Sequence, residues 1–171
     1  MAKAHEVPTP EECLAMGRMC ACYNLRRAAR AVTQLYDGYF DAVGLKTTQF
    51  TVLAVLAHAD DHPPTVTTLA SSMVLEQSSL SRNLAVLERL GHVRLVPGED
   101  RRERVVTLTR SGRAVLAQGY PVWKRAQAAI LGSLETDLES QLRALRRLTQ
   151  TALALRPRER DRKRRRNATA K

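Results

Sequence analysis

The chain has 171 residues, enough for one domain with a core of its own or for two small lobes. Its hydrophobic content of 44% is ordinary for a globular protein, and its longest nearly apolar run, residues 50–57, is far shorter than the roughly 20 residues that span a membrane. The polar N-terminus lacks a signal-peptide pattern. These features exclude an integral membrane protein, and we expect a cytoplasmic protein without a membrane partner.

The net charge of +11 favours a nucleic-acid partner, but it is distributed unevenly. Residues 156–171 hold nine Lys or Arg against Glu159 and Asp161, and they contain almost nothing apolar. This composition predicts a disordered basic tail. Such a tail either adds non-specific, salt-dependent attraction to phosphates or is a solvated terminus without a role.

The first third of the chain is predicted to be helical after a flexible N-terminus, residues 1–10. The apolar spacing from residue 11 to residue 43 predicts one helix, which Gly44 ends. A second helix, from about Thr48 to His58, is apolar nearly all round and should be buried. After a break at residues 60–64, Thr65 is a suitable N-cap for a short helix.

The next helix carries a polar face. Its leucines at positions 80, 84, 87 and 90 fall at helical spacing, and Gly91 suits the position just after a helix. The first turns hold the polar side chains of Gln77, Ser78, Ser79, Ser81, Arg82 and Asn83. Gln, Asn and Arg can form paired hydrogen bonds to base edges, and Ser can bind bases or phosphates. The alternative is that these side chains form an ordinary solvated helix face. Glu88, also on this helix, is ill suited to a neighbouring phosphate and is expected to pair within the lobe.

Two β-branched runs follow, residues 92–97 and 104–108, and a charged loop joins them. They predict a hairpin with a cationic tip. An arginine there could enter the minor groove of DNA beside a helix in the major groove, although the same charges could simply keep a hairpin soluble. The helix and the hairpin together predict binding to double-stranded DNA.

The C-terminal part is again helical. Thr109 is a suitable N-cap for a long helix to about Leu131, which Pro121 is expected to bend. Beyond it, Leu138, Leu142, Leu145, Leu148 and Ala152 form an apolar stripe. These helices and the first one carry more apolar surface than one small subunit can cover, so we predict a homodimer.

The hairpin sequence resembles a known family. The motif D-R-R at 100–102, followed by V-V-T-L-T at 105–109 and Gly112, is similar to the wing and following helix start of the MarR family of bacterial transcription regulators. Residues 68–70 and 81–91 resemble the family's two helix-turn-helix helices. The resemblance covers roughly residues 12–155.

This resemblance implies a mainly α fold with a small β-wing. Residues 44–109 would form the winged helix-turn-helix DNA-binding domain, and residues 11–43 and 110–155 the helical dimerisation region. Because the family contains repressors more often than activators, the resemblance also favours a repressor. A homodimer would bind a pseudo-palindromic operator with half-sites about one DNA turn apart.

The resemblance also assigns roles within the wing. Asp100 would orient the loop, and Arg102 would enter the minor groove. Arg101 and Arg104 would then contact phosphates.

Three cysteines, Cys13, Cys20 and Cys22, lie near the start of the chain. Cys22 and Tyr36 match the peroxide-sensing branch of the family, in which tyrosines of the partner subunit activate the cysteine. Thr47 and Arg26 stand where that branch has tyrosines, although the charge of Arg26 could itself lower the pKa of a thiol one turn away. Inert packing and a soft-metal site are the alternatives.

Release from DNA is expected to require a small-molecule effector or thiol oxidation. The low aromatic content, 4%, gives no stacking site for such an effector, whose identity stays open. No catalytic motif is present, and His58 and His62 flank a helix break, so we expect no enzyme, cofactor or metal site. The remaining alternative is an architectural DNA-binding protein that relies on the basic tail.

Overall fold

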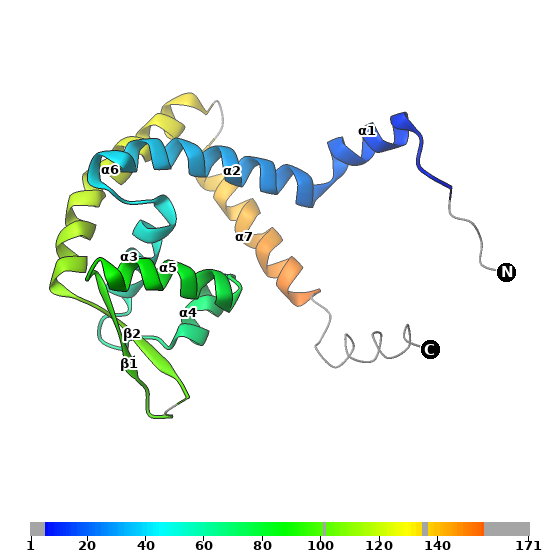
Figure 1. Ribbon diagram of the computed structural model, residues 1–171. Helices are drawn as coiled ribbons and strands as arrows, with labels where there is room; N and C mark the ends of the chain where they lie inside the picture. Colours follow the sequence, from blue (N-terminus) through cyan, green and yellow to red (C-terminus); the bar gives the residue numbers. More distant parts are fainter. Residues whose placement is uncertain (1–5, 101, 135–136, 156–171) are drawn as a thin grey trace, which may run out of the picture. The chain divides into compact units, whose positions relative to one another are not determined.

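A computed structural model describes residues 6–100, 102–134 and 137–155 (Figure 1). The chain divides into two compact units, residues 1–127 and 128–171, and each is described by itself. The first unit holds α1 (Pro10–Met19), α2 (Ala21–Phe40), η1 (Asp41–Val43), α3 (Thr47–His58), α4 (Val66–Ser72), α5 (Gln77–Arg89), β1 (Val93–Pro97) and β2 (Arg104–Leu108). Helix α6 (Arg110–Ser133) begins in this unit and ends in the second, which also holds α7 (Leu138–Ala154). The predicted fold class, mainly α with a small β-wing, is confirmed.

The single helix predicted over residues 11–43 is wrong, because the chain breaks it at Cys20. The backbone of Cys20 is extended, and its thiol accepts a hydrogen bond from the Tyr23 N–H at 3.4 Å. The side-chain amide nitrogen of Asn24 donates to the carbonyl oxygens of Gly17, Arg18 and Cys20 at 2.9–3.2 Å. These bonds satisfy groups that a helix end leaves without a partner, so they stabilise the break.

Helix α3 is the core of the first unit, as its apolar sequence predicts. Phe50, Val52, Leu53 and Leu56 are buried, and α3 contacts α2, α5 and β2. Asp37 of α2 tethers its first residue, since the Thr47 N–H and hydroxyl both donate to Asp37 Oδ1 at 2.7 Å.

Helices α4 and α5 form a helix-turn-helix. Thr65 caps α4 through a 3.1 Å bond from the Thr68 N–H, as predicted. The turn continues through Val74, whose φ of 54° is unusual for a β-branched residue. Leu80, Leu84 and Leu87 of α5 are buried. The helix ends at Arg89 with Leu90 as its C-cap, and the predicted Gly91 follows with a φ of 73°.

The hairpin β1–β2 is antiparallel, with Leu95 opposite Val106, and it projects from the helices of this unit (Figure 1). The outer edge of β2 is covered by the chain before α4. There the Val106 N–H donates to the Pro64 carbonyl oxygen at 2.9 Å. The hairpin therefore forms a winged lobe together with α4 and α5.

The start of α6 is joined closely to the end of α5. Thr109 caps α6 as predicted, since its hydroxyl accepts the Gly112 N–H at 2.9 Å and donates to the Gly91 carbonyl oxygen at 2.7 Å. A Cβ on Gly112 would overlap the carbonyl oxygen of His92 and lie 2.7 Å from Leu108 Cδ1. Only glycine fits this contact without displacing the backbone.

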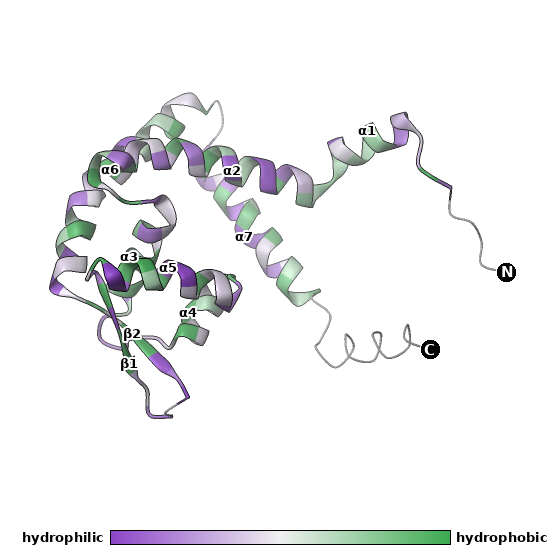
Figure 2. Cartoon of the chain, viewed as in Figure 1, coloured by the Kyte–Doolittle hydropathy of each residue, from purple (hydrophilic) through white to green (hydrophobic). Residues whose placement is uncertain are grey.

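Helices α1 and α7 differ from these core helices. None of the described side chains of either helix is buried. Apolar and polar segments alternate along α7 (Figure 2), so apolar side chains are among those left exposed. Its leucines at 142, 145, 148 and 153 are 38–44% exposed. Each helix therefore leaves an apolar face uncovered within one chain.

No single helix among the described residues has the length and apolar composition needed to cross a membrane. Two helical segments, residues 21–43 and 47–58, reach the length and apolar composition of a membrane span only when they are combined. The chain bends by 78° between them. Four side chains of the second segment are part of the protein core.

Candidate nucleic-acid interface and effector pocket

The predicted DNA-contacting residues lie on the first turns of α5. Gln77, Ser78, Ser79, Ser81 and Arg82 are exposed, and Asn83 is half-buried. The Arg82 guanidinium donates to Ser79 Oγ at 3.3 Å. Because the leucines of α5 face the core, this helix presents hydrogen-bonding groups on its free side, in the half that meets base edges in helix-turn-helix docking.

Asp100 forms two local hydrogen bonds at the wing tip. Its carboxylate accepts the Arg102 N–H at 2.9 Å, and its carbonyl oxygen accepts the Glu103 N–H at 2.9 Å. Arg102 is exposed at the tip. The Arg104 guanidinium donates to the Leu95 carbonyl oxygen at 3.0 Å within the hairpin. Arg101, the other predicted phosphate contact, lies outside the described residues, as does the basic tail.

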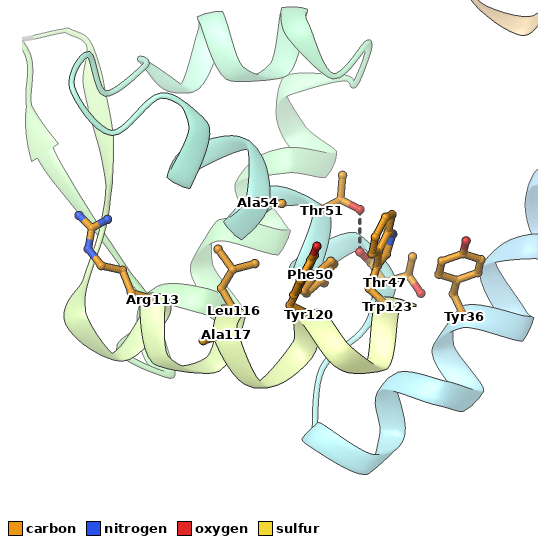
Figure 3. Close-up of a pocket in the computed structure, with 10 residues that line it drawn as sticks. All are labelled: Tyr36, Thr47, Phe50, Thr51, Ala54, Arg113, Leu116, Ala117, Tyr120 and Trp123. Atoms are coloured by element: carbon orange, nitrogen blue, oxygen red, sulfur yellow. Dashed lines mark hydrogen bonds between the residues drawn. The ribbon is translucent and has the colours of Figure 1, made fainter. Parts of the chain in front are cut away.

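A cavity of about 740 Å³ lies between α2, α3 and α6 in the first unit (Figure 3). Its size falls within the range usual for small-molecule sites. The lining residues are Tyr36, Thr47, Phe50, Thr51, Ala54, Arg113, Leu116, Ala117, Tyr120 and Trp123. Leu116, Ala117 and Ala54 make much of this wall apolar.

The expectation that the chain has no aromatic stacking site is therefore wrong. Four of its seven aromatic residues line this single cavity. The rings of Tyr120 and Trp123 are stacked with centroids 5.9 Å apart, and the Lys124 ammonium lies 4.9 Å from the Tyr120 ring centroid. Tyr120 and Trp123 are three residues apart on α6, so helical spacing alone places their rings side by side, whereas tertiary folding adds Tyr36 and Phe50 from other helices.

Polar groups stand at the two ends of the cavity (Figure 3). Arg113 at one end pairs with Asp60 at 2.6 Å, and this hydrogen bond lowers the pKa of the Asp60 carboxyl. Tyr36 at the other end donates to Gln127 Oε1, and burial raises the pKa of its phenol. An arginine and a neutral phenol can therefore orient a planar ligand held between aromatic rings.

The cysteines are exposed rather than packed in a core, and among the described residues none forms a disulfide. Cys22 and Tyr36 lie fourteen residues apart on α2, so the helix rise separates them by about 21 Å. Within one chain Tyr36 therefore does not reach Cys22. Arg26 is exposed one turn beyond Cys22.

Across the part of the chain that the structure describes, no group of three or more His, Cys, Asp or Glu side chains is placed to hold a metal ion. Asp60, one of two acidic residues between His58 and His62, forms an ion pair with Arg113. The three thiols likewise form no metal cluster within one chain.

Similarity to known proteins was found at three levels. Residues 43–103 match the MarR family. The M. tuberculosis transcriptional regulator MosR in complex with DNA is 39% identical, and the match covers 81% of this chain and 99% of that chain with a TM-score of 0.73. The curated relative BadR of Rhodopseudomonas palustris, a transcriptional activatory protein, is 36% identical over 107 residues, which are 57% of this chain and 54% of BadR. The chain thus matches about half the length of that relative.

A more distant structure agrees in fold. A mutant of E. coli MarR complexed with operator DNA is 22% identical, and the match covers 84% of this chain and 99% of that chain with a TM-score of 0.67. The family match at residues 43–103 contains α4, α5 and β1. The near-complete coverage of MosR extends the likeness to the flanking helices. The chain belongs to the MarR family of winged helix-turn-helix transcriptional regulators.

Proposed function

We propose that the protein binds double-stranded DNA sequence-specifically as a homodimer and regulates transcription from a pseudo-palindromic operator in the cytoplasm, without enzymatic activity. The observation that carries this is the pairing of a free polar face on α5 with a wing that exposes Arg102 at its tip. The two elements suit the major and the minor groove. A relative with 39% identity has been solved in complex with DNA.

The homodimer is supported by the uncovered apolar faces of the outer helices. Leu14, Met16 and Met19 of α1 are 58–87% exposed. Leu25, Val32 and Leu35 of α2 are 37–45% exposed, as are four leucines of α7, at positions 142, 145, 148 and 153. Large exposed apolar surfaces of this kind mark interfaces. A second copy of the chain is the partner that satisfies the two-fold symmetry of a palindrome.

A small-molecule effector is supported by the aromatic cavity. A ligand there would contact α2, α3 and α6 together, so its binding depends on their relative placement. To release the protein from DNA, it must bind the DNA-incompetent arrangement more tightly. A nearly complete shift between states takes about 5.5 kcal/mol of differential binding.

The direction of regulation rests on the resemblance, which favours repression. The curated relative BadR is named as an activatory protein, so activation is the alternative. A reporter fused to the selected operator decides this: expression that rises when the regulator is deleted identifies a repressor, and expression that falls identifies an activator.

The experiment that tests the main proposal is selection of bound genomic fragments by the purified protein at near-physiological salt. We expect an enriched pseudo-palindrome whose half-sites lie about one DNA turn apart. A matched arm uses a variant with Ser81 and Arg82 changed to Ala, which should lose enrichment while its circular dichroism and melting temperature stay unchanged. No enriched motif with the unaltered protein would defeat the proposal.

Thiol-based sensing is the second candidate, and the exposure of Cys22 is the observation that favours it. It predicts that organic peroxide removes the enrichment, that reductant restores it, and that Cys22→Ser abolishes this response. Equal enrichment with peroxide and with reductant excludes it. The same peroxide arm with Cys13→Ser serves as the matched control.

The architectural alternative places DNA binding in residues 156–171. It predicts weak sequence preference and loss of binding when the tail is removed. Retention of the palindrome by a chain ending at residue 155 would exclude it, because the winged lobe is intact in that variant. If the DNA affinity of the shortened chain depends less on salt, the difference would measure the phosphate attraction that the tail adds.

A further inference from the structure

The backbone N–H and carbonyl oxygen of Leu95 both form hydrogen bonds to charged side chains, and the proposed DNA contacts do not explain these bonds. Leu95 and Val106 are partners across the hairpin, and their polar groups point away from each other toward the two outer edges. On the β2 side, the Pro64 carbonyl oxygen accepts the Val106 N–H at 2.9 Å. On the β1 side, two charged side chains take the place of a third strand.

Those side chains are Glu88 and Arg104. Glu88, in the last turn of α5, accepts the Leu95 N–H through Oε1 at 3.1 Å. Arg104, at the start of β2, donates from Nη2 to the Leu95 carbonyl oxygen at 3.0 Å. Both outward groups of one residue are thereby satisfied, at a strand edge that would otherwise be open.

We infer that Glu88 and Arg104 are positioning residues that close the β1 edge at Leu95 and so fix the wing against the recognition helix α5. This inference rests on the proposed DNA binding and assigns Arg104 to the hairpin rather than to a phosphate. It also gives a reason for a carboxylate on a helix that faces DNA. Near phosphates that charge is unfavourable by itself, but here it joins α5 to the wing.

The length of the hairpin beyond Leu95 determines how far a tilt of the wing would displace its tip. Arg102 precedes Val106, the partner of Leu95 across the hairpin, by four residues, or roughly 13 Å at about 3.3 Å per residue. A tilt of about 10° at Leu95 would then move the tip by roughly 2 Å, which exceeds the tolerance of a hydrogen bond. The tip can keep its place in the minor groove only if the hairpin is held near its base.

The test compares two substitutions that remove the same charge. Glu88→Ala removes the acceptor, whereas Glu88→Gln keeps an oxygen that can accept the Leu95 N–H. If Glu88 acted only as a negative charge, both variants would bind the operator more tightly. The inference instead predicts roughly tenfold weaker binding for Glu88→Ala, the scale of one lost groove contact, and no loss for Glu88→Gln.

Two further readouts follow the wing itself. Hydroxyl-radical footprinting should show loss of minor-groove protection at the operator flanks for Glu88→Ala and for Arg104→Ala, with no further loss in the double variant. Amide hydrogen exchange at Leu95, measured by NMR on DNA-free protein, should speed up in Glu88→Ala and not in Glu88→Gln. Glu99→Ala, which removes an acidic side chain from the hairpin loop, is the control that should leave the footprint intact.

Tighter binding by Glu88→Ala, equal damage by Glu88→Gln, or additive effects of the two alanine variants would each overturn the inference. Unchanged Leu95 exchange in Glu88→Ala would do so without any DNA measurement. Failure of the unaltered protein to select any operator would instead defeat the proposed function. Thermal melting identifies a variant that has simply unfolded.

Discussion

Helices α5 and α7 carry apolar residues at the same three- and four-residue spacing, yet they differ in what covers them. Leu80, Leu84 and Leu87 of α5 are at most 1% exposed, because α3, α4 and β1 pack around that helix. Leu145 of α7 is 44% exposed. Apolar spacing thus predicts which face of a helix will be buried, but not whether the covering surface belongs to the same chain.

The largest expected effect tests what covers α7. Leu145→Asp places a charge in the proposed interface, so we expect a monomer by sedimentation velocity. Its operator binding should weaken at least 100-fold, since linking two half-site contacts commonly contributes factors of about 10²–10⁴. Gln150→Asp introduces the same charge away from the leucine stripe and should leave the dimer intact. A dimeric Leu145→Asp would mean that α7 is not in the interface.

The next effect concerns two glycines of α6, which sharpen the same contrast. Gly112→Ala forces a methyl group against the His92 backbone and should lower the free energy of unfolding by about 1–3 kcal/mol or more. Gly132 has nothing within 4 Å of an added Cβ, and Gly132→Ala should stabilise the helix by up to about 1 kcal/mol. Urea unfolding measures both. Destabilisation by Gly132→Ala would indicate that a partner chain packs there.

A third prediction concerns the wing tip. Arg102→Ala should weaken operator binding roughly tenfold and reduce the preference for A·T pairs at the flanks, because a narrow minor groove attracts arginine. Arg102→Lys keeps the charge and separates the two effects. If alanine only lowers the slope of log affinity against log salt by about 0.9, with the A·T preference unchanged, Arg102 is a phosphate contact instead.

The smallest effect is at Asp37, where α2 is bonded to the start of α3. Burial raises the pKa of its carboxyl, but the hydrogen bonds from Thr47 and the charge of Lys46 outweigh this and leave the pKa lowered. A lowered pKa in the folded state stabilises the fold above the ordinary carboxyl range, and the stabilisation is lost as the pH falls through the folded value. Asp37→Ala should therefore cost about 1 kcal/mol at pH 7.

That cost should diminish as the pH falls from the ordinary carboxyl range through the lowered folded pKa of Asp37, because the carboxyl then becomes protonated. Urea unfolding at pH 7 and near pH 3 gives the comparison, and Asp61→Ala, an exposed residue of the following turn, is the control. A cost at Asp37 that is independent of pH would mean that packing, rather than the charge, holds the start of α3.

The winged lobe was largely predictable because its signals are local. Thr65, Gly91 and Thr109 mark helix ends by side-chain chemistry or backbone conformation alone, and β-branched residues mark the strands. The break at Cys20 was missed because no proline or glycine causes it. It depends on Asn24, whose amide reaches back over the helix end in a way that periodicity does not reveal.

The candidate site was predictable only in part, for the same reason. Residues of α5 and the wing follow one another in the sequence, so their spacing indicates a common surface. Tyr36, Phe50 and Trp123 come from three separated helices, and only packing brings them to one cavity. The bonds of Glu88 and Arg104 to Leu95 depend likewise on the register of the hairpin.

The composition of the cavity gives the protein an optical reporter of its own. Trp123 is the only tryptophan in the chain, and it lies in the cavity wall stacked on Tyr120. Any molecule that enters must alter the surroundings of that one indole, so its emission intensity and wavelength report occupancy. Candidate effectors can therefore be screened by intrinsic fluorescence on unlabelled protein, before any operator or regulated gene is known.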